Sequence, residues 1–468
     1  NGSLEVDAST FGCANCHGFD GRGKPEGGII PTDITFNNLT KPYAVASASG
    51  RKRAPYTEAL LERAITKGLD SSANALHAAM PRYKMSPADA ANLVAYLKRL
   101  GDDRDPGIGE TVLKIGTILP SSPALADVTR DMKAVMAAYF DEVNSRGGVF
   151  NRKIELKVAD DQAASAASVR RFLEREEVFA VTGAWTAGAD KEIASLMQTE
   201  EVPMVGPLTL YPGEGLPVNR QVFYLLSGLA EQARALARFA RKKLQAQDPS
   251  ASVIFSDSEA AVGVVKTIEA ETLSSGWGEL IKLAYAPGRF DAATLARRVK
   301  DEASLVVFFL GDQAEAKAFI AESDRLGWTP HVLLSGPVAG RDMFDLPLSF
   351  KEKVLLAFPS LPSDHTEAGV AEYLRLAARY NIPRRHLPAQ FSAYAAAKVL
   401  VEGLKRAGKD LSREKLILSL EALYDFQTDL IPPLTYGPNR RIGALGAYIV
   451  LLDLERRKFV PVSEWVSL

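Results

Sequence analysis

Seven short, nearly continuous apolar runs after residue 111 constrain the fold of this chain more than any other feature. They read VLKIGTIL, IELKVAD, VFAVTGA, VPMVGP, SVIFSD, SLVVFFLG and HVLLSG. Most are followed by an amphipathic helix pattern, such as the one from Asp131 to Arg146. Buried parallel strands that alternate with helices predict a doubly wound α/β architecture. In such sheets ligands bind beyond the carboxyl ends of the strands, where this sequence has loops rich in Gly, Ser and Thr.

The first 100 residues have a different texture, with short helical pieces between Gly- and Pro-rich loops. One predicted helix begins after the N-cap Thr57 and ends at Gly68. A second begins after Ser86, which caps it, and Asp89 can complete a capping box. The polar stretch GDDRDPGIGET then predicts a linker. We therefore divide the chain into a small all-α domain at 1–100, a linker at 101–111 and an α/β part at 112–468.

Both cysteines of the chain lie in the motif CANCH. Cys13 precedes Cys16 by three positions, and His17 directly follows Cys16. Two thiols spaced in this way can bond to one haem, and the adjacent histidine can then ligate its iron. A redox dithiol is the first alternative, but that chemistry usually follows a strand. A zinc site is the second, but it needs four ligands, and two cysteines with five scattered histidines provide no second half-site. The motif favours one covalent haem c.

A haem of this kind also needs a sixth iron ligand or an open face. Met80 is followed by Pro81 and then by a capped helix, a position from which a thioether can reach the far side of the iron. Met85 and His77 are the rival candidates, and most methionines simply fill cores. The sequence favours Met80.

Residues 9–100 resemble a class I c-type cytochrome domain. The matching parts are CANCHGFDGRG, TEALLERAITKG, the MPRY loop and LVAYLKRL. The resemblance implies an electron-transfer haem and assigns five residues to it, namely Cys13 and Cys16 as thioether attachments, His17 as proximal ligand, Met80 as distal ligand and Pro31 in the loop lining the proximal side.

Residues 112–468 resemble the type I periplasmic binding proteins of the branched-chain amino acid uptake family. The cues are the long opening KIGTILPSSPALADVTRDMKAVMAAYFDEVNSRGGVFNRKIELKVADDQA, then VTGAW, VPMVGPLT and LGW before HVLLSG. The resemblance implies two α/β lobes that close over a small molecule. The expected lobes are 112–227 with 360–434, and 228–359 with 435–468. The expected crossovers lie near Ser227, 358–360 and 435–437.

The resemblance also implies a ligand pocket, although this sequence departs from the family pattern there. The loop with Thr186, Ala187 and Gly188 and the loop with Leu208 and Thr209 match positions that receive a ligand carboxylate. The usual serine is replaced by Ala187 and Gly188.

In the amino-acid binders an acidic residue grips the ligand ammonium, and Val338 stands at that position here; Asp312 is the nearest replacement. These departures disfavour a zwitterionic amino acid. They favour a less polar or anionic molecule, such as an aromatic or short organic acid, with Trp185 and Tyr211 as pocket walls. Core packing of Trp185 remains an equal alternative.

Bulk composition excludes several function classes. The net charge of −1 gives no field that would draw the chain to nucleic acid, and no apolar run is long enough to span a membrane. No catalytic motif is present, so we expect no enzyme. The run RKR at 51–53 is interpreted as a solvated loop, with a docking patch for an acidic redox partner as the alternative.

The sequence predicts a periplasmic solute-binding protein fused to a monohaem cytochrome c, in which recognition of a small organic acid or amino-acid-like molecule is coupled to electron flow toward a redox partner protein. One alternative is an electron carrier for a periplasmic dehydrogenase, with the binding domain as a docking scaffold. Another is a plain receptor that delivers its solute to an ABC permease.

Overall fold

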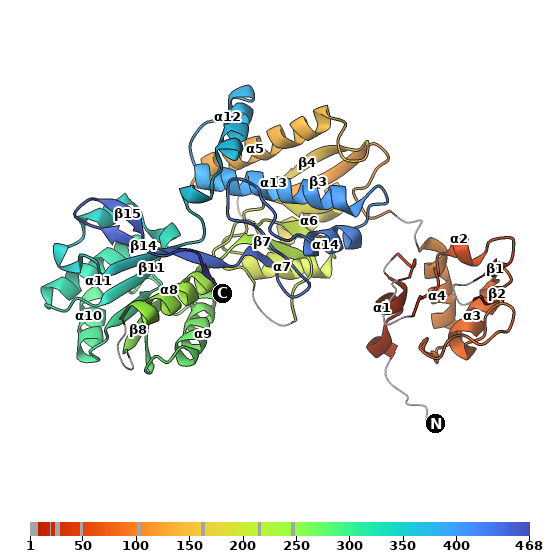
Figure 1. Cartoon of the computed structure of the whole chain (residues 1–468), viewed down its shortest axis with the longest axis horizontal. Coiled ribbons are helices and arrows are strands. Elements are labelled where there is room, and N and C mark those ends of the chain that lie inside the picture. Colours follow the sequence, from red (N-terminus) through yellow and green to blue (C-terminus); the bar gives the residue numbers. More distant parts are fainter. Residues whose placement is uncertain are drawn as a thin grey trace. The chain divides into compact units, whose positions relative to one another are not determined.

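The computed structural model describes residues 8–18, 20–23, 29–46, 50–100, 104–160, 164–213, 217–244 and 249–468. The chain divides into two units, Asn1–Asp105 and Pro106–Leu468 (Figure 1). The division falls inside the stretch 101–111 that we expected to be a linker. In the described part of the chain, no helix is both long and apolar enough to cross a membrane.

The first unit is built from short helices and one very short hairpin. Its elements are η1 (Ala8–Phe11), α1 (Cys13–His17), α2 (Phe36–Leu39), β1 (Val45–Ala46), β2 (Lys52–Arg53), α3 (Glu58–Lys67) and α4 (Pro87–Arg99). Helices α2 and α3 both pack against α4. Their shared core consists of Leu39, Tyr56, Leu61, Ala64 and Val94.

The ends of the two longer helices follow the predicted chemistry. The Thr57 hydroxyl oxygen accepts a hydrogen bond from the Leu60 amide at the start of α3, and Gly68 ends the helix in the left-handed conformation with φ +68°. The Ser86 hydroxyl oxygen accepts from the Asp89 amide at 3.1 Å. It also donates to the Asp89 carboxylate at 2.7 Å. Both predicted N-caps are confirmed.

The first lobe of the second unit contains a six-stranded sheet in the order β13-β7-β6-β5-β3-β4, and all its pairings are parallel. The strands are β3 (Val112–Ile118), β4 (Lys153–Ala159), β5 (Ala180–Thr182), β6 (Met204–Val205), β7 (Val222–Leu226) and β13 (Ile442–Ala444). The helices are α5 (Ala126–Ser145), α6 (Ala166–Glu176), α7 (Asp190–Thr199), α12 (Glu367–Arg379), α13 (Leu387–Ala407) and α14 (Arg413–Glu421). Helices α5 and α13 cover one face of the sheet, while α6 and α7 cover the other (Figure 1).

The second lobe contains an eight-stranded mixed sheet in the order β15-β14-β12-β11-β10-β8-β9, with β16 paired to β14. The strands are β8 (Ala251–Ser256), β9 (Leu280–Tyr285), β10 (Val306–Phe309), β11 (His331–Ser335), β12 (Val354–Phe358), β14 (Gly446–Asp453), β15 (Lys458–Pro461) and β16 (Val466–Ser467). The helices are α8 (Leu229–Leu244), α9 (Glu259–Ser274), α10 (Ala292–Asp301) and α11 (Gln313–Arg325), with 3-10 turns η2 (Gly336–Val338), η3 (Arg341–Asp345), η4 (Leu348–Phe350) and η5 (Pro362–Asp364). Helices α8 and α9 lie on one face, and α10 and α11 lie on the other (Figure 1).

Two boundaries differ from those expected. Helix α5 begins at Ala126, so Asp131 lies inside it, buried and ion-paired to Arg385 at 2.9 Å. The third crossover lies after Ala444 and not at 435–437, because β13 still belongs to the first lobe's sheet. This strand pairs in parallel with β7, where all three of its residues are buried. The chain therefore forms the edge strand β13 of the first lobe's sheet before it crosses to the second lobe.

Candidate functional site

The motif Cys13–His17 forms one short helix, α1, at the start of the first unit. Cys13 and Cys16 are exposed and are not bonded to each other. A helical turn carries both thiols on the same side of the helix, since residues three apart are neighbours on its surface. The two thiols are therefore open to a common partner outside the helix.

A second contact fixes the ring of His17. Its Nδ1 lies 2.8 Å from the carbonyl oxygen of Thr32. Because a carbonyl only accepts, Nδ1 must carry the proton, and Nε2 is left with its lone pair. This is how histidine ligands of metals are oriented in proteins. The sequence placed Pro31 in the loop beside the histidine, and the contacting atom belongs to the next residue.

The loop that contains Met80 is anchored beside the motif. The hydroxyl of Tyr83 donates to the carbonyl of Phe11 at 2.5 Å. Burial, followed by the nearby Cys13 thiol, raises the pKa of Tyr83 to about 12. Tyr83 thus links the MPRY loop to the start of the CANCH helix. Met80 is half-buried in that loop.

His77, the rival iron ligand, is exposed and has a local role. Its Nδ1 accepts a hydrogen bond from the Ala79 amide at 3.1 Å, which closes a turn just before Met80. Met85, the other rival, lies directly before the N-cap Ser86 and is half-buried. Tyr83 lies between Met80 and Met85 in the sequence, so its anchor does not by itself distinguish the two methionines.

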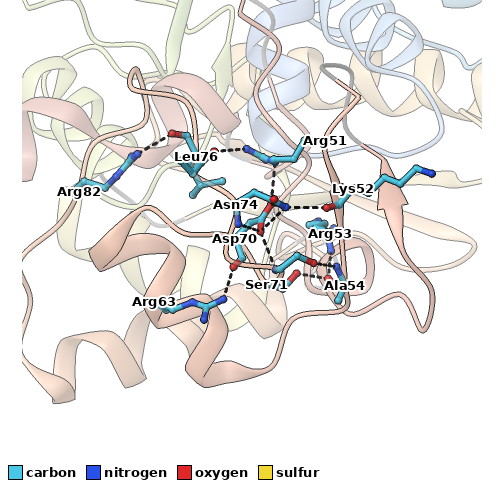
Figure 2. Close-up of polar contacts among 12 residues, drawn as sticks. Arg51, Lys52, Arg53, Ala54, Arg63, Asp70, Ser71, Asn74, Leu76 and Arg82 are labelled. Carbon is cyan, nitrogen blue, oxygen red and sulfur yellow. Dashed lines mark hydrogen bonds and ion pairs between the residues drawn. The ribbon is translucent and has the colours of Figure 1, made fainter.

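A buried carboxylate stabilises the chain that leads to Met80. Asp70 is fully buried and accepts hydrogen bonds from the amides of Ser72 and Asn74, each at 2.9 Å. Figure 2 shows Asp70 together with Asn74 and Arg51. The Nε atom of Arg51 pairs with the same carboxylate at 3.1 Å. The Asn74 side chain in turn donates to the Lys52 carbonyl at 3.1 Å. The cluster therefore joins strand β2 to the 70–76 loop.

Arg82 closes the other end of this loop. Its guanidinium donates to the carbonyl of Leu76 at 3.0 Å and to the carbonyl of Met80. The guanidinium lies directly over Gly68, where a Cβ would be only 1.7 Å from the Arg82 Nε atom. Both this close approach and the positive φ require glycine there. Hydrogen bonds thus restrain the backbone at Met80 and four residues before it.

The same cluster corrects our interpretation of RKR at 51–53. Arg53 is buried, stacks on Tyr56 with its guanidinium carbon 4.9 Å from the ring centroid, and donates to the carbonyl of Leu39 at 3.1 Å. Arg51 is paired with Asp70. Two of the three basic side chains therefore stabilise the fold, and the run is neither a solvated loop nor a basic docking patch.

These residues fit a covalent haem. The thiols are exposed, the histidine ring is oriented with a free Nε2, and the Met80 loop is anchored beside the motif. The loops that carry these groups also hold large apolar side chains in the open, at Phe11, Ile29 and Ile30, the last of them 64% exposed. An apolar macrocycle would cover such side chains, whose exposure otherwise costs free energy.

In the second unit, a buried polar network joins two of the crossovers between the lobes. The Ser227 hydroxyl donates to the Ala444 carbonyl at 3.0 Å and accepts from the Gly446 amide at 2.9 Å. Gln232 donates to the Ser227 carbonyl and accepts from the Ser335 hydroxyl at 2.6 Å. The connection at Ser227, between β7 and α8, is therefore bonded to the connection between β13 and β14.

The second crossover has its own anchor. The Asp364 carboxylate accepts from the Ser360 hydroxyl at 3.0 Å, from the Leu361 amide at 2.7 Å and from the Tyr448 hydroxyl at 2.5 Å. Tyr448 lies on β14 of the second lobe. All three connections are thus restrained by hydrogen bonds.

The predicted first-lobe pocket residues do lie together. Trp185 and Leu208 form a parallel bridge at the carboxyl ends of β5 and β6. The Thr186 amide donates to the Leu208 carbonyl at 3.2 Å, and the Tyr211 amide donates to the Thr209 hydroxyl oxygen at 2.8 Å. Trp185 is half-buried against the first lobe's core, so part of its ring serves packing.

One residue of this region was missed by the sequence analysis. The Asp190 carboxylate, in the first turn of α7, accepts from the Thr186 hydroxyl at 2.8 Å and from the Gly188 amide at 3.3 Å. These are the donors that we assigned to a ligand carboxylate. The signal was present in the sequence, since an acidic residue directly follows the loop TAGA.

Asp312 lies in the other lobe and has a structural role. Its carboxylate accepts from the Glu315 amide at 2.8 Å, and the Glu315 carboxylate accepts from the Asp312 amide at 3.1 Å. This reciprocal pair caps α11. The structure records no contact between Asp312 and the described residues of the 185–188 or 208–211 loops, so its role as a ligand residue remains a prediction.

Comparison with known proteins covers both units. Residues 112–453 match the family model described as periplasmic binding protein, and residues 8–101 match the one described as cytochrome c. The Leu/Ile/Val-binding protein BraC3 of Rhizobium johnstonii is 24% identical over 342 residues, which cover 69% of this chain and 87% of that protein. The Leu/Ile/Val-binding protein homolog 3 of Brucella melitensis is 22% identical, over 63% of this chain and 79% of that protein.

Solved structures share the fold of the second unit. A branched chain amino acid ABC transporter protein from Thermus thermophilus with bound valine has a TM-score of 0.60 at 18% identity, covering 77% of this chain and 98% of that one. A fatty acid ABC transporter substrate-binding protein from Thermomonospora curvata has a TM-score of 0.59 at 15% identity, covering 78% and 95%. Because one fold carries ligands as different as these, the fold alone does not identify a ligand.

Proposed function

Because the chain belongs to the periplasmic binding protein family over residues 112–453 and carries a cytochrome c domain at residues 8–101, we propose that it is a periplasmic receptor that couples recognition of a small amino-acid-like molecule to electron transfer through one haem c. The observation that carries the proposal is the contact between His17 Nδ1 and the Thr32 carbonyl, at 2.8 Å. This contact orients His17 so that its Nε2 atom can bind iron, on the same chain that carries the receptor fold.

Each residue of the haem site has a separate role in this proposal. Cys13 and Cys16 would form the thioether bonds, and His17, through Nε2, and Met80 would hold the haem iron. A haem with histidine and methionine ligands accepts and returns one electron at a raised potential. The chain contributes orientation, through Thr32, and an anchored distal loop, through Tyr83.

The receptor part supplies recognition. A ligand bound between the lobes favours the closed state by its difference in affinity for the closed and open states. The restrained crossovers at Ser227 and Asp364 support hinge rotation as the response. We propose that this rotation alters access to the haem or to the surface on which a redox partner protein docks. We assign no catalytic reaction to either unit.

The compartment belongs to the same proposal. Haem attachment to a C-x-x-C-H motif and the binding-protein fold both indicate the periplasm. A second candidate function, an uptake receptor that delivers solute to an ABC permease, is favoured by the names of the relatives from Rhizobium johnstonii and Brucella melitensis. Measuring whether the full chain binds an ABC permease tests that candidate directly.

The decisive experiment is a visible absorption spectrum of the full chain, oxidised and reduced, after maturation in a host that attaches c-type haem. Met80→Ala should remove the spectral signature of thioether ligation, and Met85→Ala, the matched control, should keep it. A redox titration with and without ligand then measures coupling. The absence of covalent haem, or a spectrum unchanged in Met80→Ala, would overturn the electron-transfer function. A haem potential that does not change on ligand binding would contradict the coupling and favour the uptake receptor.

A further inference from the structure

The loops at the carboxyl ends of β5 and β6 would normally offer hydrogen-bond donors to an anionic ligand, because several amides and hydroxyls converge there. In this chain five of these donors are already engaged. The amides of Trp185, Thr186 and Leu208 bond to main-chain carbonyls at 2.8, 3.2 and 2.7 Å. The Thr186 hydroxyl and the Gly188 amide bond to the Asp190 carboxylate.

The Asp190 carboxylate therefore accepts hydrogen bonds from Thr186 and Gly188 that a ligand carboxylate would otherwise accept. Thr186 is 2% exposed, so its hydroxyl has little access to solvent as an alternative partner. The negative charge is also stabilised by its position in the first turn of the ten-residue helix α7. A second carboxylate brought to the same donors would face repulsion from Asp190 and would find those donors occupied.

Among the described residues, no Lys, Arg or His side chain is recorded as an ion-pair partner of Asp190. The adjacent Lys191 pairs across the lobes with Glu259, and the Asp190 contacts recorded among the described residues are those with Thr186 and Gly188. Tyr211 is 37% exposed, and burial, followed by the negative charge of Asp190, raises its pKa. The first-lobe side of the site is therefore anionic and has an aromatic wall.

We propose that Asp190 is a specificity-determining residue, which excludes ligands that present a carboxylate to the first lobe and selects ligands that present an ammonium group there. This inference rests on the proposed receptor function and narrows its ligand class to amines with an apolar body. The amine would pair with Asp190, and the apolar body would lie against Trp185 and Tyr211.

The test uses two probes with one apolar skeleton, phenethylamine and phenylpropionate, and measures their binding to the full haem-loaded chain by calorimetry. We expect the amine to bind at least about tenfold more tightly than the acid, because one hydrogen bond to a charged group is worth about that factor. Asp190→Ala should weaken amine binding and strengthen acid binding, since it frees Thr186 and Gly188. Glu192→Ala, on the same turn of α7, is the control and should change neither.

Asp190→Asn separates charge from the contact with Thr186. Its one side-chain oxygen can still accept from the Thr186 hydroxyl, whereas the bond from the Gly188 amide, which goes to the other carboxylate oxygen, and the negative charge are lost. The preference for the amine should therefore fall. If the wild-type chain binds the acid as tightly as Asp190→Ala does, or if no acid gains affinity in Asp190→Ala, then Asp190 only restrains the 186–188 loop and the inference is wrong. Because binding is measured apart from the haem potential, that failure would leave the proposed coupling untouched. Amine binding without any shift in the haem potential would support the role of Asp190 and contradict the proposed coupling.

Discussion

His17 and Asp190 show how one contact determines what a side chain can do. The Thr32 carbonyl fixes the proton on Nδ1 of His17 and so leaves Nε2 to a metal. The Thr186 hydroxyl and the Gly188 amide hold the Asp190 carboxylate where a ligand was expected. In both cases the partner atom belongs to a loop, and its direction depends on backbone torsions that the residue type does not determine.

This difference explains which site residues could be predicted. Cys13, Cys16 and His17 are adjacent in sequence, so their chemistry follows from spacing alone. Asp190 was missed because its meaning depends on the 186–190 backbone turning its carboxylate back onto Thr186. Arg53 was misjudged for a similar reason, because its burial against Tyr56 is a tertiary contact.

The Asp70 cluster yields a stability prediction for a single residue. Asp70→Ala should lower the free energy of unfolding of the first unit by about 3 kcal/mol, because it leaves Arg51 without its buried partner and removes the acceptor for two amides. Glu58→Ala is the control, since Glu58 forms an exposed pair with Lys98 and should cost less than about 1 kcal/mol. Denaturant unfolding followed by haem absorption measures both.

The same variant should also affect the distal ligand. Asp70 restrains the loop that precedes Met80, so Asp70→Ala should weaken the spectral signature of thioether ligation under conditions in which the protein is still folded. Equal losses of stability in Asp70→Ala and Glu58→Ala would show that the buried pair stabilises the first unit no more than an exposed pair does.

His331 yields a pH prediction. Burial, followed by the positive charges of Lys353 and Lys243, lowers its pKa to about 4. In the unfolded chain the pKa is about 6.5, so between these values the unfolded state binds more protons. The stability of the second unit should therefore be complete above about pH 6.5 and fall by at most about 1.4 kcal/mol per pH unit toward pH 4.

His331→Gln should flatten this slope, because glutamine does not titrate. His77→Gln, in the other unit, should leave the second unit's slope as it is. Thermal unfolding of the second unit at a series of pH values provides the measurement, and an identical slope in wild type and His331→Gln would contradict the prediction.

Among the elements, the helices with strong caps were the ones that sequence could place. Thr57 and Ser86 fix the starts of α3 and α4 through side-chain oxygens that accept backbone amides. Helix α5 begins at Ala126 without a side-chain cap, and the sequence analysis placed its start too late, at Asp131. Strand β13 has only three residues, and its place depends on pairing with β7, which lies more than 200 residues earlier.

The crossover elements carry a prediction for the hinge. Ser227→Ala should lower the free energy of unfolding of the second unit by about 2 kcal/mol, because it leaves the buried Ala444 carbonyl and Gly446 amide without their partner. Ser145→Ala removes an exposed hydroxyl at the end of α5 and should change stability by less than about 0.5 kcal/mol.

If these bonds guide lobe rotation, Ser227→Ala should also change the rate of ligand binding, which stopped-flow fluorescence can measure. A cost no larger than that of Ser145→Ala would mean that the network between the first and third crossovers is not needed for the folded state.

For the molecule as a whole, the separation into two units limits how a ligand can act on the haem. Each unit has its own core, so a ligand that binds the second unit stabilises that unit by mass action and need not affect the first. Coupling requires that the ligand bind the oxidised and reduced chains with different affinities. This requirement is thermodynamic and holds whatever contact transmits the effect.

Reciprocity turns the proposed coupling into a quantitative prediction. A ligand that shifts the haem potential by about 59 mV must bind one redox state tenfold more tightly than the other, since the transfer involves one electron. Calorimetric affinities in the oxidised and reduced states must therefore account for the shift seen in a redox titration. Cys13→Ser/Cys16→Ser, which cannot attach haem, should bind the ligand with an affinity that no longer responds to added reductant. If the two affinities agree and the potential stays fixed, the units act independently, and the receptor carries its cytochrome domain without coupling to it.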